Sequence, residues 1–187
     1  IFDAIAARVE LKPGLRVLDF GCGTGLLTLR IGERTGRVTG ADTSAGMLEK
    51  LLEKSRAAGA SGVAALHLES QDGSGLTGEY DLITSSMTFH HVRDVAALTA
   101  RLAERLRPGG CLCVADLDPE GGRFHADNAG VFHFGFSRDE LARIFREAGL
   151  AGVQADTVSR VLRSSAAGTE EFTIFLMVGR KPLLPNP

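Results

Sequence analysis

Three glycines in one short run are the first residues whose spacing indicates chemistry. They stand at alternate positions behind an aspartate, in the pattern D-x-G-x-G-x-G, which reads Asp19-Phe20-Gly21-Cys22-Gly23-Thr24-Gly25. Glycine lets the backbone turn sharply and lets a ligand approach without a Cβ in the way. A tight strand-to-helix turn would need fewer glycines, so the run predicts a ligand-binding loop.

The acidic residues near this loop indicate the charge of the ligand. A dinucleotide fingerprint, G-x-G-x-x-G, needs glycine where Leu26 stands, and it seats a pyrophosphate on a helix N-terminus. Asp19 would repel a pyrophosphate and attract an ammonium or sulfonium group. Asp42 ends the next strand-like segment, where a carboxylate can accept both hydroxyls of a ribose. Helix capping is the alternative role of Asp42, although Thr43 or Ser44 could fill it.

Alternating strand-like and helix-like segments must position these residues. Short apolar runs predict strands at residues 16–20, 38–42, 63–68, 80–85 and 111–115. Helical spacing predicts helices at residues 1–9 and 44–58 and a third helix with Leu26, Leu27 and Ile31 inward. A fourth helix begins at an Asp94 cap and carries Val95, Leu98, Leu102 and Leu106. A capping box at Ser137 opens a fifth. Two β-rich runs, 153–162 and 172–178, predict an antiparallel hairpin at the end.

This order predicts an α/β fold, with a doubly wound sheet of parallel strands and a closing antiparallel hairpin strand. Ligands bind outside the carboxyl ends of such strands. The candidate site therefore comprises residues 20–25, 42, 69–72, 85–91 and 116–136. The sequence has no linker or repeat, so residues 1–187 are expected to form one domain. Because the sequence starts at Ile1 rather than Met, we expect a few native N-terminal residues to be missing.

Composition excludes several classes of function. The 187 residues are 44% hydrophobic and carry a formal net charge of −2, so no basic field attracts nucleic acid or anionic lipid. No apolar stretch approaches the roughly 20 residues that cross a bilayer. Three cysteines cannot form a disulfide framework and lack a zinc-binding spacing. The sequence predicts a cytoplasmic protein that neither inserts into membranes nor binds nucleic acid.

Four motifs together resemble the class I S-adenosylmethionine-dependent methyltransferases, at residues 17–25, 40–44, 79–83 and 106–110. The resemblance implies a Rossmann-like, seven-stranded, mostly parallel sheet whose last strand is antiparallel. It also implies S-adenosyl-L-methionine as cofactor and S-adenosyl-L-homocysteine as its product. The glycine loop would contact the methionine part and Asp42 the ribose. The expected cofactor residues are Asp19, Gly21, Cys22, Gly23, Thr24, Gly25, Asp42, Thr43, Met47, Glu69, Ser70 and Ser85.

The adenine side depends on a position just after the third strand. Members of the family carry an acidic residue there, about a dozen positions before the aspartate of the fourth-strand motif. Counting back from Asp81 favours Glu69 with Ser70, and Asp72 is the rival. A solvated loop carboxylate is the alternative for either acidic residue.

The segment after the fourth strand, residues 85–91, ends in His90-His91. It lacks the Asn- or Asp-Pro-Pro-aromatic motif of nucleic-acid amino-methylating enzymes, the glutamate pair of protein arginine methyltransferases and the acidic ligands of catechol-type enzymes. It resembles the small-molecule (type 11-like) group, which often has a similar His-His. His90 and His91 are candidate catalytic residues; the alternative is that one caps a helix or bonds a carbonyl and the other is exposed. No metal site is predicted, although Asp116, Asp118 and Asp127-Asn128 do not exclude one.

Aromatic residues gather in the long connection before the last helix. Four of the ten phenylalanines and two of the five histidines fall within residues 123–136. The whole connection, from Asp116 to Phe136, is long for a compact domain, and such loops are more often lids or binding loops than plain connections. A satellite core beneath a long loop is the alternative. The predicted substrate-binding residues are His91, Phe124, His125, Phe132 and His133.

These observations predict methyl transfer to a small-molecule acceptor by in-line displacement. Such a reaction needs the acceptor held in line and water excluded, and it needs a general base only if the acceptor must lose a proton. A catalytically silent S-adenosylmethionine-binding module is one alternative. A dinucleotide-dependent oxidoreductase is another, which Asp19 and Leu26 disfavour. The sequence leaves the acceptor, the methylated atom and the oligomeric state open.

Overall fold

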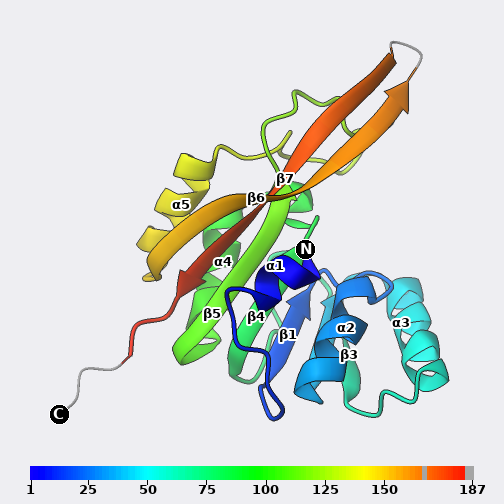
Figure 1. Cartoon of the computed structure of the whole chain (residues 1–187), viewed down its shortest axis with the longest axis vertical. Helices are drawn as coiled ribbons and strands as arrows, with labels where there is room; N and C mark the ends of the chain where they lie inside the picture. Colours follow the sequence, from blue (N-terminus) through cyan, green and yellow to red (C-terminus); the bar gives the residue numbers. More distant parts are fainter. Residues whose placement is uncertain (166–167, 184–187) are drawn as a thin grey trace.

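The computed structural model describes residues 1–165 and 168–183, and Figure 1 shows the course of the chain. Residues 166–167, within the loop expected between the last two strands, lie outside the described residues. In chain order the elements are α1 (Phe2–Ala6), β1 (Val17–Phe20), α2 (Leu26–Thr35), β2 (Val38–Asp42), α3 (Ala45–Ala57), β3 (Val63–His67), β4 (Tyr80–Ser86), the 3₁₀ helix η1 (Phe89–His91), α4 (Val95–Glu104), β5 (Leu106–Leu117), α5 (Arg138–Glu147), β6 (Ala151–Ser165) and β7 (Gly168–Arg180).

One seven-stranded sheet organises these elements, in the order β3-β2-β1-β4-β5-β7-β6. The first five strands pair in parallel, whereas β7 pairs antiparallel with both β5 and β6. This arrangement confirms the predicted doubly wound α/β sheet with its antiparallel C-terminal strand. The strand order reverses direction at β1 and β4, which is where ligands bind in open α/β sheets.

The sheet separates two apolar layers, because successive strand residues point to opposite faces. Leu18 and Ile83 face one layer, which includes the inner sides of α4 and α5. Val17 and Leu82 face the other layer, which includes α1 and α2. Both faces are therefore covered, as parallel sheets require.

Side-chain caps fix where three helices begin. Ser44 Oγ accepts a hydrogen bond from the N–H of Met47, Asp94 Oδ1 from that of Ala97 and Ser137 Oγ from that of Glu140. The last two caps confirm the predicted helix starts. Capping of this kind satisfies backbone donors that the first helical turn leaves unpaired.

Three details of the predicted helices were wrong. Leu106 opens β5 instead of ending α4, because its backbone already pairs with Tyr80 in the sheet. Leu26 is 78% exposed, since it points away from the buried side of α2, which Thr28 and Ile31 form. The first helix ends at Ala6, so residues 7–9 lie beyond it.

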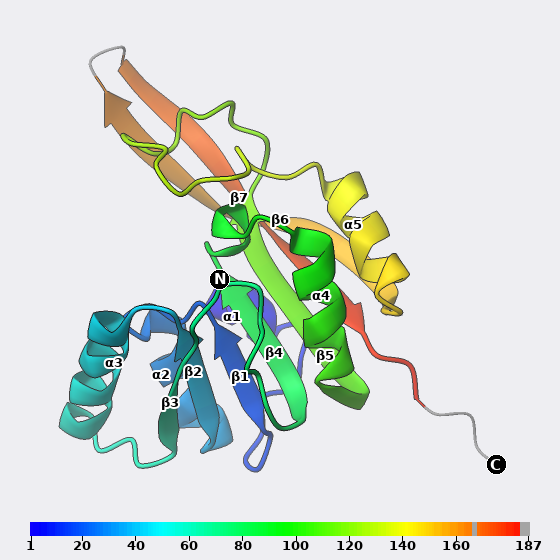
Figure 2. The same ribbon diagram turned by 180° about the vertical axis from the view of Figure 1, so that it is seen from behind.

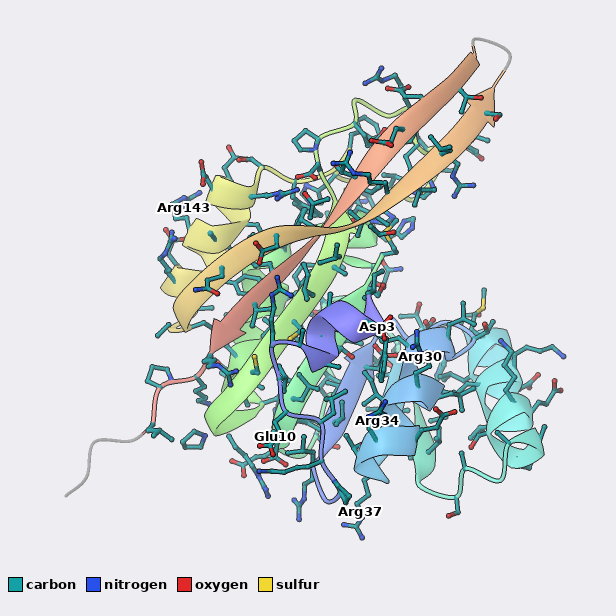
Figure 3. All side chains as sticks on the ribbon, in the orientation of Figure 1. Asp3, Glu10, Arg30, Arg34, Arg37 and Arg143 are labelled. Atoms are coloured by element: carbon teal, nitrogen blue, oxygen red, sulfur yellow. The ribbon has the colours of Figure 1, made fainter. Side chains whose placement is uncertain are left out.

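The short helix α1 is attached to α2 mainly by apolar burial. Phe2 and Ile5 are buried in the layer that α1 and α2 share. Asp3 and Arg30 lie side by side (Figure 3), with their charged groups 3.2 Å apart. The Arg30 guanidinium also stands 4.2 Å from the centre of the Phe2 ring. Both charged side chains are largely exposed, so their ion pair contributes little stability.

The β6–β7 hairpin extends beyond the body of the sheet, and the connection between β5 and α5 runs beside it (Figures 1 and 2). Asp118 joins the two: its N–H donates to the carbonyl of Thr173, and its carboxylate accepts from the Thr173 hydroxyl at 2.6 Å. The Arg138 guanidinium donates hydrogen bonds from two of its nitrogens to the two oxygens of the same carboxylate. We call residues 118–137 the β5–α5 loop.

Among the described residues, no helix is both long enough and apolar enough to cross a membrane.

Candidate active site

A cavity of about 370 Å³ opens at the carboxyl ends of the parallel strands. Its walls include Gly21 and Gly23 after β1, Asp42 at the end of β2, Leu68 after β3 and His91 in η1. Four segments far apart in the sequence therefore meet at the edge where the strand order predicts ligand binding. Another cavity lies at the opposite, amino ends of the strands, and it contains none of the predicted site residues.

The glycines after β1 serve two different purposes. Gly21, Gly23 and Gly25 all have positive φ angles, at 69°, 53° and 83°. A Cβ on Gly21 would lie 2.2 Å from Thr88 Cγ2, and one on Gly25 would lie 2.2 Å from Leu51 Cδ1. A Cβ on Gly23 would have no atom within 4 Å. Gly21 and Gly25 are thus required by packing, whereas Gly23 leaves open space where its backbone borders the cavity.

Asp42 connects the glycine loop to the start of α3. Its Oδ2 accepts a hydrogen bond from the N–H of Gly23 at 2.8 Å, and its Oδ1 accepts one from the N–H of Ser44 at 2.9 Å. The hydroxyl of Ser44 caps α3, so Asp42 is not needed as the cap. Each carboxylate oxygen keeps further lone-pair capacity, which two hydroxyl groups of a ligand could use.

Asp19 lies beneath the loop and is not among the residues of the cavity wall. Its side chain is buried, and it accepts hydrogen bonds from the hydroxyls of Thr28 at 2.6 Å and Thr84 at 2.9 Å. Burial raises the pKa of Asp19 to about 6, and the nearby charge of Asp42 also raises it. Asp19 holds α2 and β4 together behind the glycines.

Two other predicted loop residues also point away from the cavity. Cys22 packs against Leu48 and Leu51 in a small apolar cluster under α3, and this burial raises the pKa of its thiol. Thr24 accepts hydrogen bonds from the Lys54 ammonium through both its hydroxyl and its carbonyl oxygen, at 2.8 and 3.1 Å. Both residues attach the loop to α3.

The residues after β2 and β3 complete one side of the cavity. Thr43 and Met47 lie on its wall, as do Leu68 and Gln71. Glu69 and Ser70 are exposed and are not among the wall residues. The rival Asp72 is engaged elsewhere: it pairs with Arg101 at 2.6 Å. Hydrogen bonds from Ser74 and Arg101 hold the pKa of Asp72 well below its usual range.

The segment after β4 is strained where it meets the cavity. Met87 has a φ of 56°, the only positive value outside glycine among the described residues, and such strain is concentrated at functional sites. The Thr88 hydroxyl donates to the carbonyl of Gly21 at 3.2 Å, which ties this segment to the glycine loop. Met87 and Thr88 both lie on the wall. Ser85 is buried close by in sequence, and its hydroxyl has no partner among the described residues.

The two adjacent histidines differ in their surroundings. His90 is buried, and its Nδ1 lies 2.7 Å from Oδ1 of Asp116 at the end of β5. His91 lies on the cavity wall, with its Nδ1 2.8 Å from the carbonyl oxygen of Gly130. One histidine bonds a backbone carbonyl, as in the alternative considered above, but neither is simply an exposed side chain.

The β5–α5 loop contains both buried and exposed aromatic residues. Phe124 is buried and meets Phe172 edge to face, with ring centres 5.4 Å apart. Phe132 and Phe134 are 42% and 46% exposed. His133 Nε2 lies 2.9 Å from the carbonyl oxygen of Val92. Phe124 therefore belongs to the apolar layer that includes α1 and α2, and none of the predicted loop residues Phe124, His125, Phe132 and His133 is on the cavity wall.

His125 approaches His90 from this loop. Their Nε2 atoms are 3.2 Å apart, and the ring centres are 5.1 Å apart. Burial and the neighbouring His90 and His91 lower the pKa of His125. The loop is further held by the carbonyl of His90, which accepts hydrogen bonds from the N–H groups of Phe132 and His133.

Comparison with known proteins identifies the kind of domain that carries this cavity. Residues 1–155 match the family described as methyltransferase domain. The chain belongs to the class I S-adenosylmethionine-dependent methyltransferases. It is 32% identical over 158 residues to an uncharacterised methyltransferase of Schizosaccharomyces pombe, covering 76% of this chain and 56% of that protein. Over 112 residues it is 38% identical to trans-aconitate 2-methyltransferase of Deinococcus radiodurans, covering 59% of this chain and 41% of that enzyme.

The fold of this methyltransferase domain matches solved structures along nearly its whole length. The YcgJ protein of Bacillus subtilis superposes with a TM-score of 0.78 at 16% identity, covering 97% of each chain. By contrast, the chain spans about half the length of the curated relatives it matches.

S-adenosylmethionine fits the residues that this methyltransferase domain presents. The backbone at Gly23 borders open space and Asp42 has free acceptor capacity, whereas the predicted Ser85 is buried and is not on the cavity wall. When bound, the cofactor supplies an electrophilic methyl group on a sulfonium. The cavity volume is within the range of pockets that enclose small molecules.

Six residues of the cavity wall were not among the predicted binding residues, although all except Ser44 and Leu68 fall within the predicted ranges at the strand ends: Phe20, Ser44, Leu68, Gln71, Met87 and Thr88. Leu68 and Gln71 flank the predicted pair after β3, and Met87 and Thr88 precede the histidines. The positive φ of Met87 has no sequence signal, since it is not a glycine. Thr88 has no such signal either, because its contact with Gly21 joins segments 67 residues apart in the chain.

Proposed function

We propose that this chain transfers a methyl group from S-adenosylmethionine to a small-molecule acceptor. The proposal rests on the cavity that joins Gly23 and Asp42 on one side to His91 on the other. A cofactor and an acceptor can meet there without leaving the carboxyl edge of the sheet. The domain class makes S-adenosylmethionine the cofactor to test first.

The cofactor would lie along the wall formed by the ends of β1, β2 and β3. Gly23 allows close approach of the methionine part, and the lone pairs of Asp42 accept the ribose hydroxyls. Met47, Leu68 and Gln71 then lie on the side left for the adenine. Asp19 and Asp42 give this region negative charge, which suits the positive sulfonium and ammonium groups.

The acceptor would bind between η1 and the β5–α5 loop. His91 lies on the wall there, whereas Phe132 and Phe134 of the loop are nearly half exposed outside the wall and would contact an acceptor only if the loop moved toward η1. The reaction would be an in-line displacement in which the acceptor atom forms a bond to the methyl carbon as the bond to sulfur breaks. Positioning and exclusion of water are the main contributions of the protein. His91 would remove a proton only for an acceptor that must lose one.

The net charge of the chain and its similarity to a methyltransferase named for a small molecule both favour a small acceptor over a macromolecule. The net charge of −2 provides no basic surface for nucleic acid. The name of the Deinococcus radiodurans relative assigns it trans-aconitate, a small molecule. A cytoplasmic location stays a prediction.

The test is transfer of label from S-adenosylmethionine with a tritiated methyl group into a metabolite extract. We expect label in the small-molecule fraction, and less of it at subsaturating cofactor when the Asp42→Ala variant replaces the wild type. Label in the protein or nucleic-acid fraction would contradict the small-molecule acceptor. Binding of S-adenosylhomocysteine without any transfer would indicate a silent binding module. Binding of NAD instead would indicate an oxidoreductase.

A further inference from the structure

Three histidines from two distant segments converge beside the proposed acceptor space. His90 and His91 come from η1, and His125 comes from the β5–α5 loop. One ring nitrogen of each lies within 4.8 Å of the corresponding atoms of the other two. Three imidazoles this close together repel one another if they are protonated. The cluster is therefore more favourable when the rings are neutral and bind one cation in common.

Hydrogen bonds to the far side of two rings determine which nitrogens are free. The carboxylate of Asp116 accepts from Nδ1 of His90, and the carbonyl of Gly130 accepts from Nδ1 of His91. Since a carboxylate and a carbonyl only accept, both Nδ1 atoms bear the proton. In the neutral rings, Nε2 of His90 and Nε2 of His91 each present a bare lone pair.

Asp116 is itself held in place. The N–H groups of His90 and Leu117 both donate to its carboxylate, and the side chains of Asp116 and His90 are 0% and 1% exposed. A buried carboxylate that orients a histidine is the usual outer partner of a metal-bound imidazole. Asp116 is thus a positioning residue for His90.

We propose that His90, His91 and His125 form a binding site for a divalent transition-metal ion, with zinc as the representative ion. Three imidazole ligands with a remaining open position are typical of catalytic zinc sites. At metal–nitrogen distances of 2.0–2.1 Å, tetrahedral ligand atoms lie about 3.3 Å apart. The Nε2 atoms of His90 and His125 are already 3.2 Å apart. Small rotations of His91 and His125 would complete the set.

The metal site would border the cavity, because His91 lies on its wall. An ion there could bind a hydroxyl or thiol of the acceptor and lower its pKa. This consequence rests on the proposed function, whereas the metal site itself does not. Without an ion, the same atoms would form a relay in which His125 donates a hydrogen bond to His90. Measurement of metal affinity therefore distinguishes the metal site from a cluster that is held only by the hydrogen bond between His125 and His90.

The test uses the whole chain, freed of metal with a chelator and titrated with zinc alone against a chromophoric zinc indicator. We expect one ion per chain. His125→Ala should weaken binding by more than about 100-fold, and Asp116→Asn, which keeps the hydrogen bond but removes the charge, by roughly 10–100-fold. His133→Ala is the matched control, because this histidine of the same loop bonds the carbonyl of Val92 and lies outside the cluster. Its zinc affinity should equal that of the wild type.

Cobalt substitution gives a second measurement, since a tetrahedral Co²⁺ site absorbs visible light strongly and an octahedral surface ion does not. Absence of a stoichiometric site, or equal weakening by His125→Ala and His133→Ala, would overturn the proposal. Circular dichroism of each variant shows whether a loss of zinc affinity results from unfolding. If a variant is unfolded, His91→Gln is measured in its place. Binding of S-adenosylhomocysteine is measured separately, so zinc binding without it would leave the metal site standing and contradict methyl transfer.

Discussion

The carboxylate of Asp42 accepts a hydrogen bond from the backbone N–H of Gly23 at 2.8 Å, and this bond joins the ends of β1 and β2. The residue proposed to bind the ribose therefore also shapes the loop proposed to bind the methionine part. A change at Asp42 acts on the cofactor both directly and through the loop.

Asp42→Ala is expected to weaken the binding of S-adenosylhomocysteine by about 1–3 kcal/mol, the range for hydroxyl groups left without a partner. Isothermal titration calorimetry measures the loss. Asp72→Ala is the control, because Asp72 pairs with Arg101 and is not on the cavity wall. Unchanged affinity in a folded Asp42→Ala protein would refute the ribose assignment. A loss of affinity in the Asp72→Ala protein would favour Asp72, the rival candidate, as the residue on the adenine side.

Substitutions of two glycines should separate packing from ligand approach. Gly21→Ala and Gly23→Ala both place a side chain at positive φ, at a cost of roughly 1–2 kcal/mol. Gly21→Ala also overlaps Thr88, which should remove roughly 1–3 kcal/mol more. Urea denaturation should therefore show a larger loss of stability for Gly21→Ala. Gly23→Ala should lower the affinity for the cofactor by more than its loss of stability explains. Equal stability losses would contradict the distinction.

The order of the elements could be predicted because each rests on local pattern. The β-rich runs, the Asp94 and Ser137 caps and the glycine loop are readable from a few neighbouring residues, and the sheet follows from their alternation. Leu26 shows the limit of this method. An apolar residue at the first position of a helix matched the pattern, yet the turn of the helix left it facing solvent.

The site could be predicted only in part, because it depends on contacts between segments far apart. The sequence located the ends of the right strands, but it could not tell that Leu68 and Gln71, rather than Glu69 and Ser70, reach the cavity wall. The meeting of His125 with His90 has no periodic signal, since a loop without regular structure brings them together.

The buried carboxyl of Asp19 should make stability depend on pH. Burial raises its pKa from 3.8 to about 6, so the folded state holds the proton more tightly than the unfolded state. The resulting stabilisation is fully present below about pH 4 and is lost as the pH rises through about 6. A shift of this size corresponds to about 3 kcal/mol. Asp19→Asn, which does not titrate, should lack this fall.

Urea denaturation of both proteins across this pH window measures the effect. The difference in unfolding free energy between wild type and Asp19→Asn should change in favour of the variant as the pH rises. A constant difference from pH 4 to pH 7 would mean that the bonds from Thr28 and Thr84 cancel the cost of burial.

The aromatic residues of the β5–α5 loop should divide into two groups by their roles. Phe124 is buried against Phe172, so Phe124→Ala should cost about 3–5 kcal/mol of stability. Phe132 and Phe134 are nearly half exposed, and their joint replacement by Ala should have a small effect on stability. If these two side chains cover the acceptor, the double variant should lose methyl transfer far more than affinity for S-adenosylhomocysteine.

Hydrogen exchange follows the movement that such a cover requires. The N–H groups of Phe132 and His133 bond the carbonyl of His90, so their exchange reports whether the loop is attached to η1. We expect faster exchange in the free protein than with S-adenosylhomocysteine and an acceptor bound together, because closure over both ligands excludes water. Exchange already slow in the free protein, together with a large stability loss in the Phe132→Ala, Phe134→Ala variant, would contradict the cover. It would show instead that these phenylalanines stabilise the loop as a fixed part of the fold, with the acceptor held by η1 alone.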